Sequence, residues 1–504
     1  MRLAVAGSGL QGRAEDAKRR NQPVRSLPLG PQVWSVSERF EIVSIARVRF
    51  KPFVQFKFKP IDGAVVAPQG FLAGGIFCDI KRLGTGKGSD KGRKRDLCLL
   101  VSETPAAVAG LFTTNQICAA PVKVCVSRVA KGVAQAVVVN SGNANACTGR
   151  QGMKDALAMT GLAEKVLGLS TGRVLVGSTG RIGVQLPMEQ VASGIVAAAE
   201  VLGSTPEHAA HAAEAIMTSD SRPKTMAIEL KIGGRIVRIG GMCKGAGMIQ
   251  PGMSPTGARP ATAPSGGPAG LHATMLCFIT TDADIAAKPL QSALNEAVAS
   301  SFNRITVDGD MSTNDTVLAL ANGLAGNAAI RKASGKDFEA FQAALSHVCL
   351  SLAKMIVCDG EGVHRVVTVR VEGARSFADA DAAARAVANS ALVKTSWHGG
   401  DPNWGRIIDA LGYSSAKIVE DKVDIGYAAS GTKKILWSLR RGQPTKTPFA
   451  DLWKAVQADT FELHIRLNLG KASAVMYAAD LTEEYVDFNK GAIADPSQAG
   501  ALGG

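Results

Sequence analysis

The stretch LHATMLCFITTD, residues 271–282, joins two very different kinds of sequence. The run before it, SPTGARPATAPSGGPAG (254–270), consists mostly of Gly, Pro, Ala, Ser and Thr, a composition typical of flexible segments. From Met275 onward the residues are largely apolar, β-branched or aromatic, which predicts a buried strand. Thr274 therefore stands where a flexible segment meets the core of the fold.

Thr274 has a chemical interpretation as well as a structural one. Threonine is a poor nucleophile unless a base takes its proton, and the α-amine of an N-terminal threonine, with an ordinary pKa of about 7.7 to 8.0, can be that base. An internal threonine becomes N-terminal when its hydroxyl attacks the preceding peptide carbonyl, here that of Ala273, and the resulting ester hydrolyses. The alternative is an ordinary β-branched residue that opens a strand.

Length and composition exclude several classes of protein. A chain of 504 residues predicts two or three folded units, and its apolar runs have the length of core strands, so we expect no membrane span. The net charge of +14 comes mainly from residues 1–60, with 12 Lys and Arg against 4 Asp and Glu, and from residues 81–96, with 7 against 2. Because the positive charge is confined to these two pieces and aromatic residues make up only 5%, we expect no nucleic-acid partner.

Residues 1–60 show no periodic pattern, and we predict a basic leader or extension that is disordered. A transit peptide is the alternative and would place the protein in an organelle, but the four acidic residues favour a cytoplasmic location. The nine cysteines form no Cys-x-x-Cys pair, which favours free thiols in a reducing compartment. The seven histidines are dispersed, so no metal site is predicted.

Apolar patterns place the chain in the mixed α and β class. A Gly-Gly pair inside 226–241 predicts a hairpin, and apolar residues at intervals of three and four predict a helix over 338–355. Further strands are predicted at 97–103, 134–140 and 173–178, and further helices at 154–168 and 206–217.

Polar clusters rich in Gly, Asn and Asp follow the ends of the predicted elements. One such cluster alone is typical of a turn, but six together predict loops that gather around one site. The clusters are 140–149, 178–183, 244–253, 307–316, 359–362 and 399–406. Their carboxylates could form an acid–base pair or a cation site, although turn and capping roles are favoured; they are Asp308, Asp310, Asp315 and Glu361.

A series of short motifs runs in one order along the chain: APQGFLAGG, FTTN, APV, NSGNANACTG, STGRIG, IMTSDSRPK, KGAGMI, ATMLCFITTDA, VDGDMSTNDTVL, DGEG, GGDPNWGRI and DLTEEYV. In these motifs the chain, from about residue 61 to 489, resembles the ornithine acetyltransferase family, the bifunctional glutamate N-acetyltransferases of arginine biosynthesis. So many motifs in one order are far more specific than any single one.

The resemblance implies a fold and a division of the chain. The fold is an αββα-type layered sandwich, shared with related aminopeptidases, followed by a smaller C-terminal α/β domain. The chain would divide into an α segment, 61–273, and a β segment, 274–504, that begins at the nucleophile. Residues 254–272 form a flexible insert that relatives lack, and a loose tether there could slow self-cleavage.

The resemblance also implies the reaction. The precursor would split between Ala273 and Thr274, and Thr274 would pass an acetyl group from N-acetylornithine to glutamate by a ping-pong mechanism, with no cofactor and no metal. Acetyl-CoA is a further acetyl donor in bifunctional members, and the two segments would form a heterotetramer. Thr179 and Gly180 would stabilise the oxyanion. The substrate contacts carry over onto Thr218, Lys244, Glu361 and Asn489.

Two other interpretations stay open. One is an amidase or aminopeptidase of the related fold, in which water replaces glutamate as the acceptor. The other is an uncleaved, inactive relative, which the long insert before Thr274 makes worth considering. In addition, Ala494 stands where relatives carry a terminal Ser or Thr that contacts substrate, so one substrate hydrogen bond would be missing.

Overall fold

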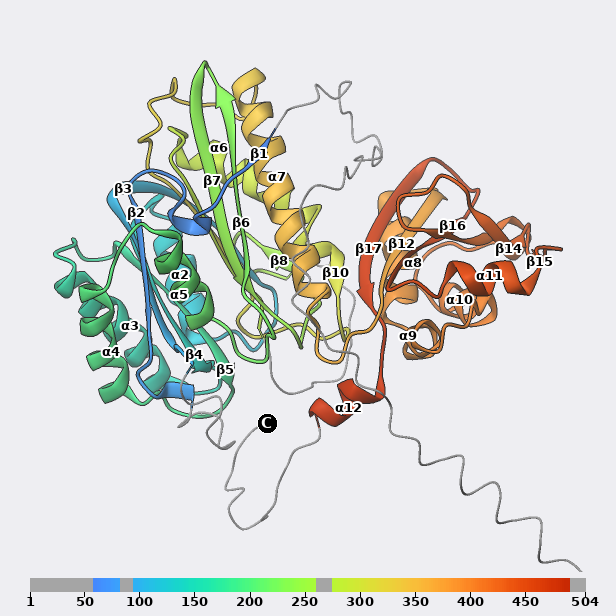
Figure 1. Ribbon diagram of the computed structural model, residues 1–504, viewed down its shortest axis with the longest axis horizontal. Helices are drawn as coiled ribbons and strands as arrows, with labels where there is room; N and C mark the ends of the chain where they lie inside the picture. The colour runs from blue at the N-terminus through green and yellow to red at the C-terminus, as the bar shows by residue number, and fades with distance from the viewer. Residues whose placement is uncertain (1–57, 82–93, 260–273, 490–504) are drawn as a thin grey trace, which may run out of the picture. The chain divides into compact units, whose positions relative to one another are not determined.

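The computed structural model describes residues 58–81, 94–259 and 274–489. Ten strands form the larger sheet, in the order β1-β6-β7-β9-β11-β3-β4-β5, with β2 and β8 also paired to β3 (Figure 1). They are β1 (Lys59–Pro60), β2 (Phe71–Ile76), β3 (Leu97–Thr113), β4 (Val133–Asn143), β5 (Val174–Arg181), β6 (Lys224–Ile232), β7 (Arg235–Lys244), β8 (Met253–Ser254), β9 (Leu276–Thr281) and β11 (Thr316–Ala321).

The long strand β3 turns this sheet into two layers. Its first part pairs with β2 and with most of β4, its second part pairs with β11, and the register shifts between Val101 and Ala106. Side chains of one layer pack on the other, since a Cβ atom on Gly177 of β5 would lie 3.2 Å from the ring of Phe278 in β9. The apolar space between the layers is therefore one core.

Helices cover the outer face of each layer (Figure 1). One outer face is packed by α2 (Ala120–Val129), α3 (Gly149–Val166) and α4 (Met188–Glu200), and the other by α6 (Ala287–Ala299) and α7 (Lys336–Val357). Helix α5 (Pro206–Ala215) packs on the opposite face of β2 from α4, because Gly74 faces α4 and Gly75 faces α5. The αββα sandwich that the sequence predicts is confirmed. Within the described ranges α7 alone is long and apolar enough to cross a membrane by length and composition, but its apolar residues, Phe341 and Leu352 among them, are buried in the core.

A second sheet of seven strands and its helices form the smaller C-terminal α/β domain, with its own apolar core. The strand order is β10-β17-β12-β16-β13-β14-β15. Its strands are β10 (Ile305–Thr306), β12 (Val366–Ala374), β13 (Asp424–Ala429), β14 (Leu436–Arg440), β15 (Gln443–Pro444), β16 (Thr460–Arg466) and β17 (Ala472–Ala479). Its helices are α8 (Phe377–Asn389), α9 (Ala391–His398), α10 (Trp404–Gly412) and α11 (Phe449–Ala455), and α12 (Glu483–Asn489) follows β17.

The elements predicted from the sequence occur in the structure, but β3 continues ten residues beyond the predicted end at 103, and the predicted bounds of the leader and of the insert also differ. The hairpin is β6 and β7, whose turn residues Gly233 and Gly234 both have positive φ, 55° and 82°. Strand β1 begins inside the predicted leader, because Lys59 and Pro60 pair with β6. Ser254, the first residue of the predicted insert, lies in β8 and pairs with Phe112 of β3, and its carbonyl accepts a hydrogen bond from the N–H of Gly257 in the turn that follows. Most of the leader, residues 260–272 of the insert, and Ala494 lie outside the described residues.

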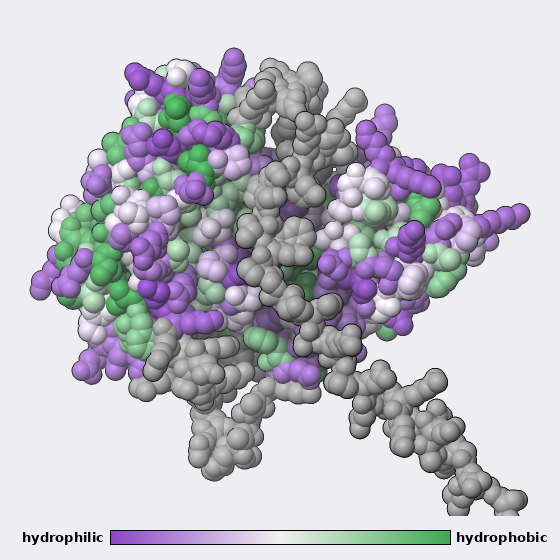
Figure 2. Space-filling view, in the orientation of Figure 1, coloured by the Kyte–Doolittle hydropathy of each residue, from purple (hydrophilic) through white to green (hydrophobic). Residues whose placement is uncertain are grey.

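On the face that Figure 2 shows, the described residues are mainly hydrophilic, with a few apolar side chains among them. The large apolar side chains exposed on α3 and α4 are Leu157, Val166 and Val196. Leu157 and Val166 are nine residues apart, so they point to opposite sides of α3 and do not share one surface. Isolated exposed apolar residues of this kind are common in soluble proteins.

Candidate active site

Thr274 lies at the entrance of β9 and is almost completely buried, at 3% exposure. Its Oγ1 lies 2.9 Å from Oγ of Ser312. Ser312 is fixed from two sides, because its Oγ accepts a hydrogen bond from the backbone N–H of Asn314 at 3.0 Å and its carbonyl accepts one from the Thr113 hydroxyl at 2.6 Å. The hydroxyl of Thr274 is therefore held by a rigid partner, as a nucleophile must be.

The loop that carries Ser312 connects the two sheets. It leaves the second sheet at β10 and enters the larger sheet at β11, whose first residue pairs with Leu276 of β9. Lys394 of α9 holds the start of the loop, since its buried Nζ donates to the carbonyl of Val307 at 2.7 Å. The pKa of Lys394 is lowered to about 8, because burial removes the charged ammonium from water.

Asp315 follows in the same loop and is fully buried. Its Oδ1 accepts a hydrogen bond from the backbone N–H of Met275 at 3.1 Å, directly after Thr274. Its Oδ2 has no hydrogen-bond partner in the described part of the chain. Burial raises the pKa of Asp315 to about 8, and the hydrogen bond from Met275 and the charge of Lys244 act in the opposite direction but do not offset the loss of water.

The segment Thr179–Gly180 is brought next to this loop by Asn314. The Asn314 side chain donates to the carbonyls of Ala144, at 2.7 Å, and Ser178, at 2.9 Å. Oγ1 of the buried Thr179 has no partner among the residues that the structure describes. Gly180 has φ 128° and approaches the backbone of Gly142 so closely that a Cβ would lie 2.3 Å from its carbonyl carbon. A buried hydroxyl of this kind, beside the loop that carries Ser312, has a hydrogen-bond donor left for a ligand oxygen.

Lys244 forms the next wall of the site. It is fully buried at the end of β7, opposite Leu276 of β9. Its ammonium donates to Oγ1 of Thr218 at 2.7 Å and lies 3.7 Å from Oδ2 of Asp220. Burial lowers the pKa of Lys244, and the Asp220 carboxylate opposes this effect. The structure thus brings two predicted substrate contacts, Thr218 and Lys244, into direct contact.

Behind this wall lies a network of paired charges. Asp220 also accepts a hydrogen bond from Lys224, at 2.6 Å, and Lys224 donates to Asp359 at 2.5 Å. Burial raises the pKa of Asp220, but the two lysines outweigh it, so that this pKa lies below its ordinary value. Burial likewise lowers the pKa of Lys224, but its two carboxylate partners outweigh it, so that this pKa lies above its ordinary value. Every charge of this network has an opposite charge beside it, which is what keeps the charges tolerable in the core.

Glu361 and Asn489 form the remaining wall. The backbone N–H of Glu361 donates to the carbonyl of Ala246, and Gly247 lies so close to the Glu361 carboxylate that a Cβ there would be 2.6 Å away. Nδ2 of Asn489, in α12, donates to Oε2 of Glu361 at 3.1 Å. Burial raises the pKa of Glu361, while the hydrogen bond from Asn489 lowers it in part. Lys244 and Glu361 thus offer one positive and one negative group to a ligand.

Five of the six polar clusters predicted to surround a site do meet there. The carboxylate of Asp308 accepts hydrogen bonds from the backbone N–H groups of Met248 and Ile249 and so joins the clusters 244–253 and 307–316. Asp308 thus has the turn role that the sequence favours. The sixth cluster, 399–406, does not join: Asn403 caps α10 by accepting a hydrogen bond from the N–H of Arg406. In the described ranges no group of His, Cys, Asp and Glu could hold a metal ion.

One connected set of contacts contains all but one of the predicted site residues, namely Thr274, Thr179, Gly180, Thr218, Lys244, Glu361 and Asn489. The exception, Ala273, lies outside the described residues. The sequence did not single out Ser312 or Asp220. Each stands within a recognised motif, Ser312 in VDGDMSTNDT and Asp220 two residues after Thr218, but nothing in the sequence indicates that their side chains face the site.

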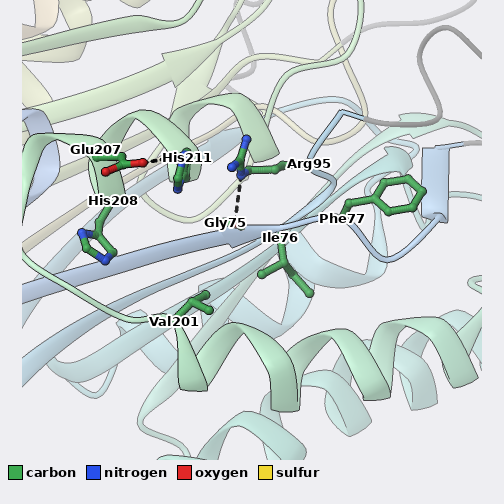
Figure 3. Close-up of a pocket in the computed structure, with 8 residues that line it drawn as sticks. All are labelled: Gly75, Ile76, Phe77, Arg95, Val201, Glu207, His208 and His211. Atoms are coloured by element: carbon green, nitrogen blue, oxygen red, sulfur yellow. Dashed lines mark hydrogen bonds and ion pairs between the residues drawn. The ribbon is translucent and has the colours of Figure 1, made fainter.

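A surface pocket of about 540 Å³ lies elsewhere, between β2 and α5 (Figure 3). Arg95, His208 and His211 contribute polar groups, but Arg95 is paired with Glu214 at 2.7 Å and His211 lies 3.7 Å from Glu207. None of the predicted site residues lines this pocket. Its polar groups are occupied by their own neighbours, so the pocket has no evident ligand chemistry.

Comparison with known proteins places the chain among characterised sequences. Residues 80–491 match the model of the ArgJ family. An arginine biosynthesis bifunctional protein ArgJ from Symbiobacterium thermophilum is 46% identical over 429 residues, which cover 85% of this chain and 98% of that protein. The protein of the same name from Lactococcus lactis is 41% identical over 431 residues, 86% and 98% of the two chains. The solved ornithine acetyltransferase of Mycobacterium tuberculosis, complexed with ornithine, is 35% identical and covers 39% of this chain and 100% of its own, with a TM-score of 0.35.

Proposed function

The chain belongs to the ArgJ family of arginine biosynthesis, and we propose that it is an acyltransferase that moves an acetyl group from N2-acetylornithine to glutamate, with Thr274 as the nucleophile. The observation that carries the proposal is the position of the Thr274 hydroxyl, buried and hydrogen-bonded to Ser312. Around it lie an unpartnered Thr179 hydroxyl, seen within the described ranges, and the oppositely charged Lys244 and Glu361.

The first chemical step in this proposal is cleavage of the chain itself. Oγ1 of Thr274 attacks the carbonyl carbon of Ala273, the C–N bond breaks, and the hydroxyl proton passes to the Thr274 nitrogen. Water then hydrolyses the ester, leaving a carboxylate on Ala273 and a free hydroxyl and α-amine on Thr274. The strand after Thr274 holds its position, because the backbone of Met275 is bonded to both Asp315 and Thr316.

Transfer then takes place in two matched half-reactions. The Thr274 hydroxyl attacks the acetyl carbonyl, its proton passes to the α-amine, and ornithine leaves with that proton as the amide C–N bond breaks. The glutamate amine next attacks the acetyl ester on Thr274, the ester C–O bond breaks, and a proton of the attacking amine passes by way of the α-amine to the Thr274 oxygen as N-acetylglutamate leaves. Because an amide is exchanged for an amide, the reaction balances without a nucleotide or a metal. The tetrahedral oxyanion of each half-reaction would be stabilised by Thr179 and Gly180.

The substrates carry both a carboxylate and an amino group, and the site offers a partner for each. We assign Lys244 to the substrate carboxylate and Glu361, with Asn489 behind it, to the substrate amine. Thr218 orients the Lys244 ammonium. A Lys244→Ala variant is expected to raise KM for glutamate by at least tenfold; a normal KM would contradict the assignment.

The decisive test combines mass and activity. Purified protein is expected to give two fragments that meet at Ala273 and Thr274, and to transfer isotope-labelled acetyl from N-acetylornithine to glutamate. Thr274→Ala should stay uncut and inactive, while Thr274→Ser keeps a hydroxyl and should still be cut. Acetate release without N-acetylglutamate would indicate an amidase, and an uncut but active chain would refute the mechanism. A parallel assay with acetyl-CoA and glutamate decides whether acetyl-CoA is a further donor.

We further propose that the two segments assemble as a heterotetramer and that the enzyme works in the cytoplasm. The exposed apolar side chains of Leu157 and Val196, on the adjacent helices α3 and α4, support a contact with a second copy. Light scattering should give a mass near twice that of the 52.3 kDa chain. A mass near that of one chain would contradict the assembly.

A further inference from the structure

Asp315 is a carboxyl group that the backbone holds against Met275, the residue after Thr274. Its carbonyl accepts a hydrogen bond from the N–H of Thr113 at 2.8 Å, and the N–H of Thr316 donates to the carbonyl of Met275 at 3.1 Å. Its Oδ1 is bound to the N–H of Met275. The second oxygen, Oδ2, is buried and has no partner in residues 58–81, 94–259 or 274–489. A rigid carboxyl group thus keeps one oxygen free beside the start of β9.

The charges that face Asp315 do not satisfy it. Lys244 of β7 is the cation that acts on it, and its ammonium is already bound to Thr218 and lies beside Asp220. Asp308, in the loop after β10, acts on it with the same sign of charge. At neutral pH the uncut chain therefore holds Asp315 mainly as the neutral acid, since its pKa is raised to about 8.

Cleavage would place a new basic group next to this acid. Successive backbone nitrogens are separated by three bonds and lie about 3 to 4 Å apart. The α-amine of a freed Thr274 would accordingly lie one such step from the N–H of Met275, to which Asp315 is already bound. The free Oδ2, about 2 Å from Oδ1 within the same carboxyl group, is then within reach of the amine.

We propose that Asp315 is the positioning residue of the N-terminal base, forming an ion pair with the α-ammonium of Thr274 in the processed enzyme. The proposal rests on the cleavage described above. On cleavage the proton of the Asp315 acid passes to the new amine, giving carboxylate and ammonium. Before each turnover the ammonium loses this proton to solvent, and the Thr274 hydroxyl proton then moves to the neutral amine as the acetyl carbonyl is attacked. The Asp315 carboxylate stabilises the resulting ammonium until the proton passes to the leaving amine.

The ion pair has a measurable consequence for the base. A carboxylate beside the α-amine raises the pKa of that amine, and only the neutral amine can accept the hydroxyl proton. Removing the charge of Asp315 should therefore move the acidic limb of the pH profile of kcat/KM to lower pH. At the same time the plateau should fall, because the ammonium formed in the transition state loses its counter-ion.

The test compares wild type with Asp315→Asn, in which the side-chain oxygen can still accept the hydrogen bond from Met275. We expect the variant to be cut, its acidic limb to shift by about one pH unit to lower pH, and its plateau to fall at least tenfold. The control is Asp310→Asn, a carboxyl group of the same loop, which should leave the limb in place. The rate at which cyanate modifies the Thr274 amine, followed by mass across pH, gives the amine pKa independently of activity.

Each outcome decides the question. A cut Asp315→Asn enzyme with lower activity but an unshifted limb and an unshifted cyanate profile would assign Asp315 a purely structural role and overturn the proposal. An Asp315→Asn chain that stays uncut would place Asp315 in cleavage instead, and also overturns it. Failure of the proposed function is recognised separately, because wild type itself would then be uncut or transfer no acetyl.

Discussion

Two buried aspartates on opposite walls of the site have opposite surroundings. Asp220 lies between Lys224 and Lys244 and accepts hydrogen bonds from Lys224 and from the N–H of Gly245. Oδ1 of Asp315 accepts a hydrogen bond from the N–H of Met275, and within the described residues Oδ2 has no hydrogen-bond partner. Burial tends to raise both pKa values, yet the pKa of Asp220 lies below the ordinary value and that of Asp315 is about 8.

The different surroundings of Asp220 and Asp315 suit two different roles within one site. The charges around Asp220 are mutually neutralised, so this wall holds Lys244 in one place and changes little during a reaction. The polar groups around Thr274 are not all satisfied, and an unsatisfied buried group is costly in the resting chain. Such groups have capacity left for charges that appear only after cleavage or in a transition state.

The largest expected effect comes from removing the charge of Asp220 from the network of paired charges. Asp220→Asn leaves Lys244 without its nearest carboxylate and Lys224 with only Asp359, both in the core. We expect the free energy of unfolding to fall by about 3 to 5 kcal/mol, read as a lower urea midpoint at an unchanged slope. Glu229→Gln, which removes an ion pair with the exposed Lys59, is the control and should leave the midpoint unchanged. If the free energy of unfolding falls only slightly in Asp220→Asn, water must reach Lys224 and Lys244 in the variant.

The unsatisfied hydroxyl of Thr179 provides the next largest effect. Thr179→Val keeps the shape of the side chain but removes the donor, and kcat should fall by about 10²-fold with little change in KM. Steady-state kinetics of acetyl transfer measures this split. Thr179→Ser retains the hydroxyl and should stay within a few-fold of wild type. If Thr179→Val is as active as wild type, Gly180 and other donors suffice for the oxyanion.

The raised pKa of Asp315 predicts how the stability of the uncut chain depends on pH. In the folded chain the carboxyl holds its proton up to a pKa of about 8, whereas the unfolded chain loses it near the ordinary value of about 4. The folded state therefore binds more protons between these limits, and stability falls as pH rises from about 4 to 8. In an uncut Thr274→Ala background, Asp315→Asn lacks this loss. Over that range its free energy of unfolding should rise relative to the parent by several kcal/mol, since one pKa unit corresponds to about 1.4 kcal/mol. Parallel urea midpoints at every pH would contradict the unpaired state of Asp315.

Much of the fold could be predicted from sequence, because its elements are set by local patterns. The Gly-Gly turn of the hairpin needs positive φ at both residues, and the apolar spacing along 338–355 continues over the full length of α7. The layered sandwich itself was predicted only through the resemblance. Its origin is the shift of partners along β3 between Val101 and Ala106, and no local pattern encodes this change.

The site was predicted as a set of residues but not as a set of contacts. Thr274, Lys244 and Glu361 stand in recognisable motifs. The partners that fix them come from other strands and loops, such as Ser312 for Thr274 and Asp220 for Lys244, and only the register of β7, β9 and β11 brings them together. Conversely, the polar cluster 399–406 has the same composition as the site loops, yet its Asn403 caps a helix. Composition predicts a polar loop and cannot tell a cap from a ligand group.

The smallest expected effect concerns Glu361, whose surroundings are intermediate between those of Asp220 and Asp315. Its carboxylate is buried and accepts a hydrogen bond from Asn489. That hydrogen bond favours the charged carboxylate, so Asn489→Ala should raise the pKa of Glu361 above its already raised value. Because only the ionised carboxylate binds a substrate ammonium, KM for glutamate should begin to rise at a higher pH than in wild type as the pH is lowered. At neutral pH the loss should be about 1 kcal/mol, or roughly fivefold in KM. Val486→Ala, an exposed position of the same helix, controls for effects on α12 and should leave the KM profile unchanged. If the Asn489→Ala and Val486→Ala profiles coincide, Asn489 does not act on Glu361, and the helix serves only to cover the site.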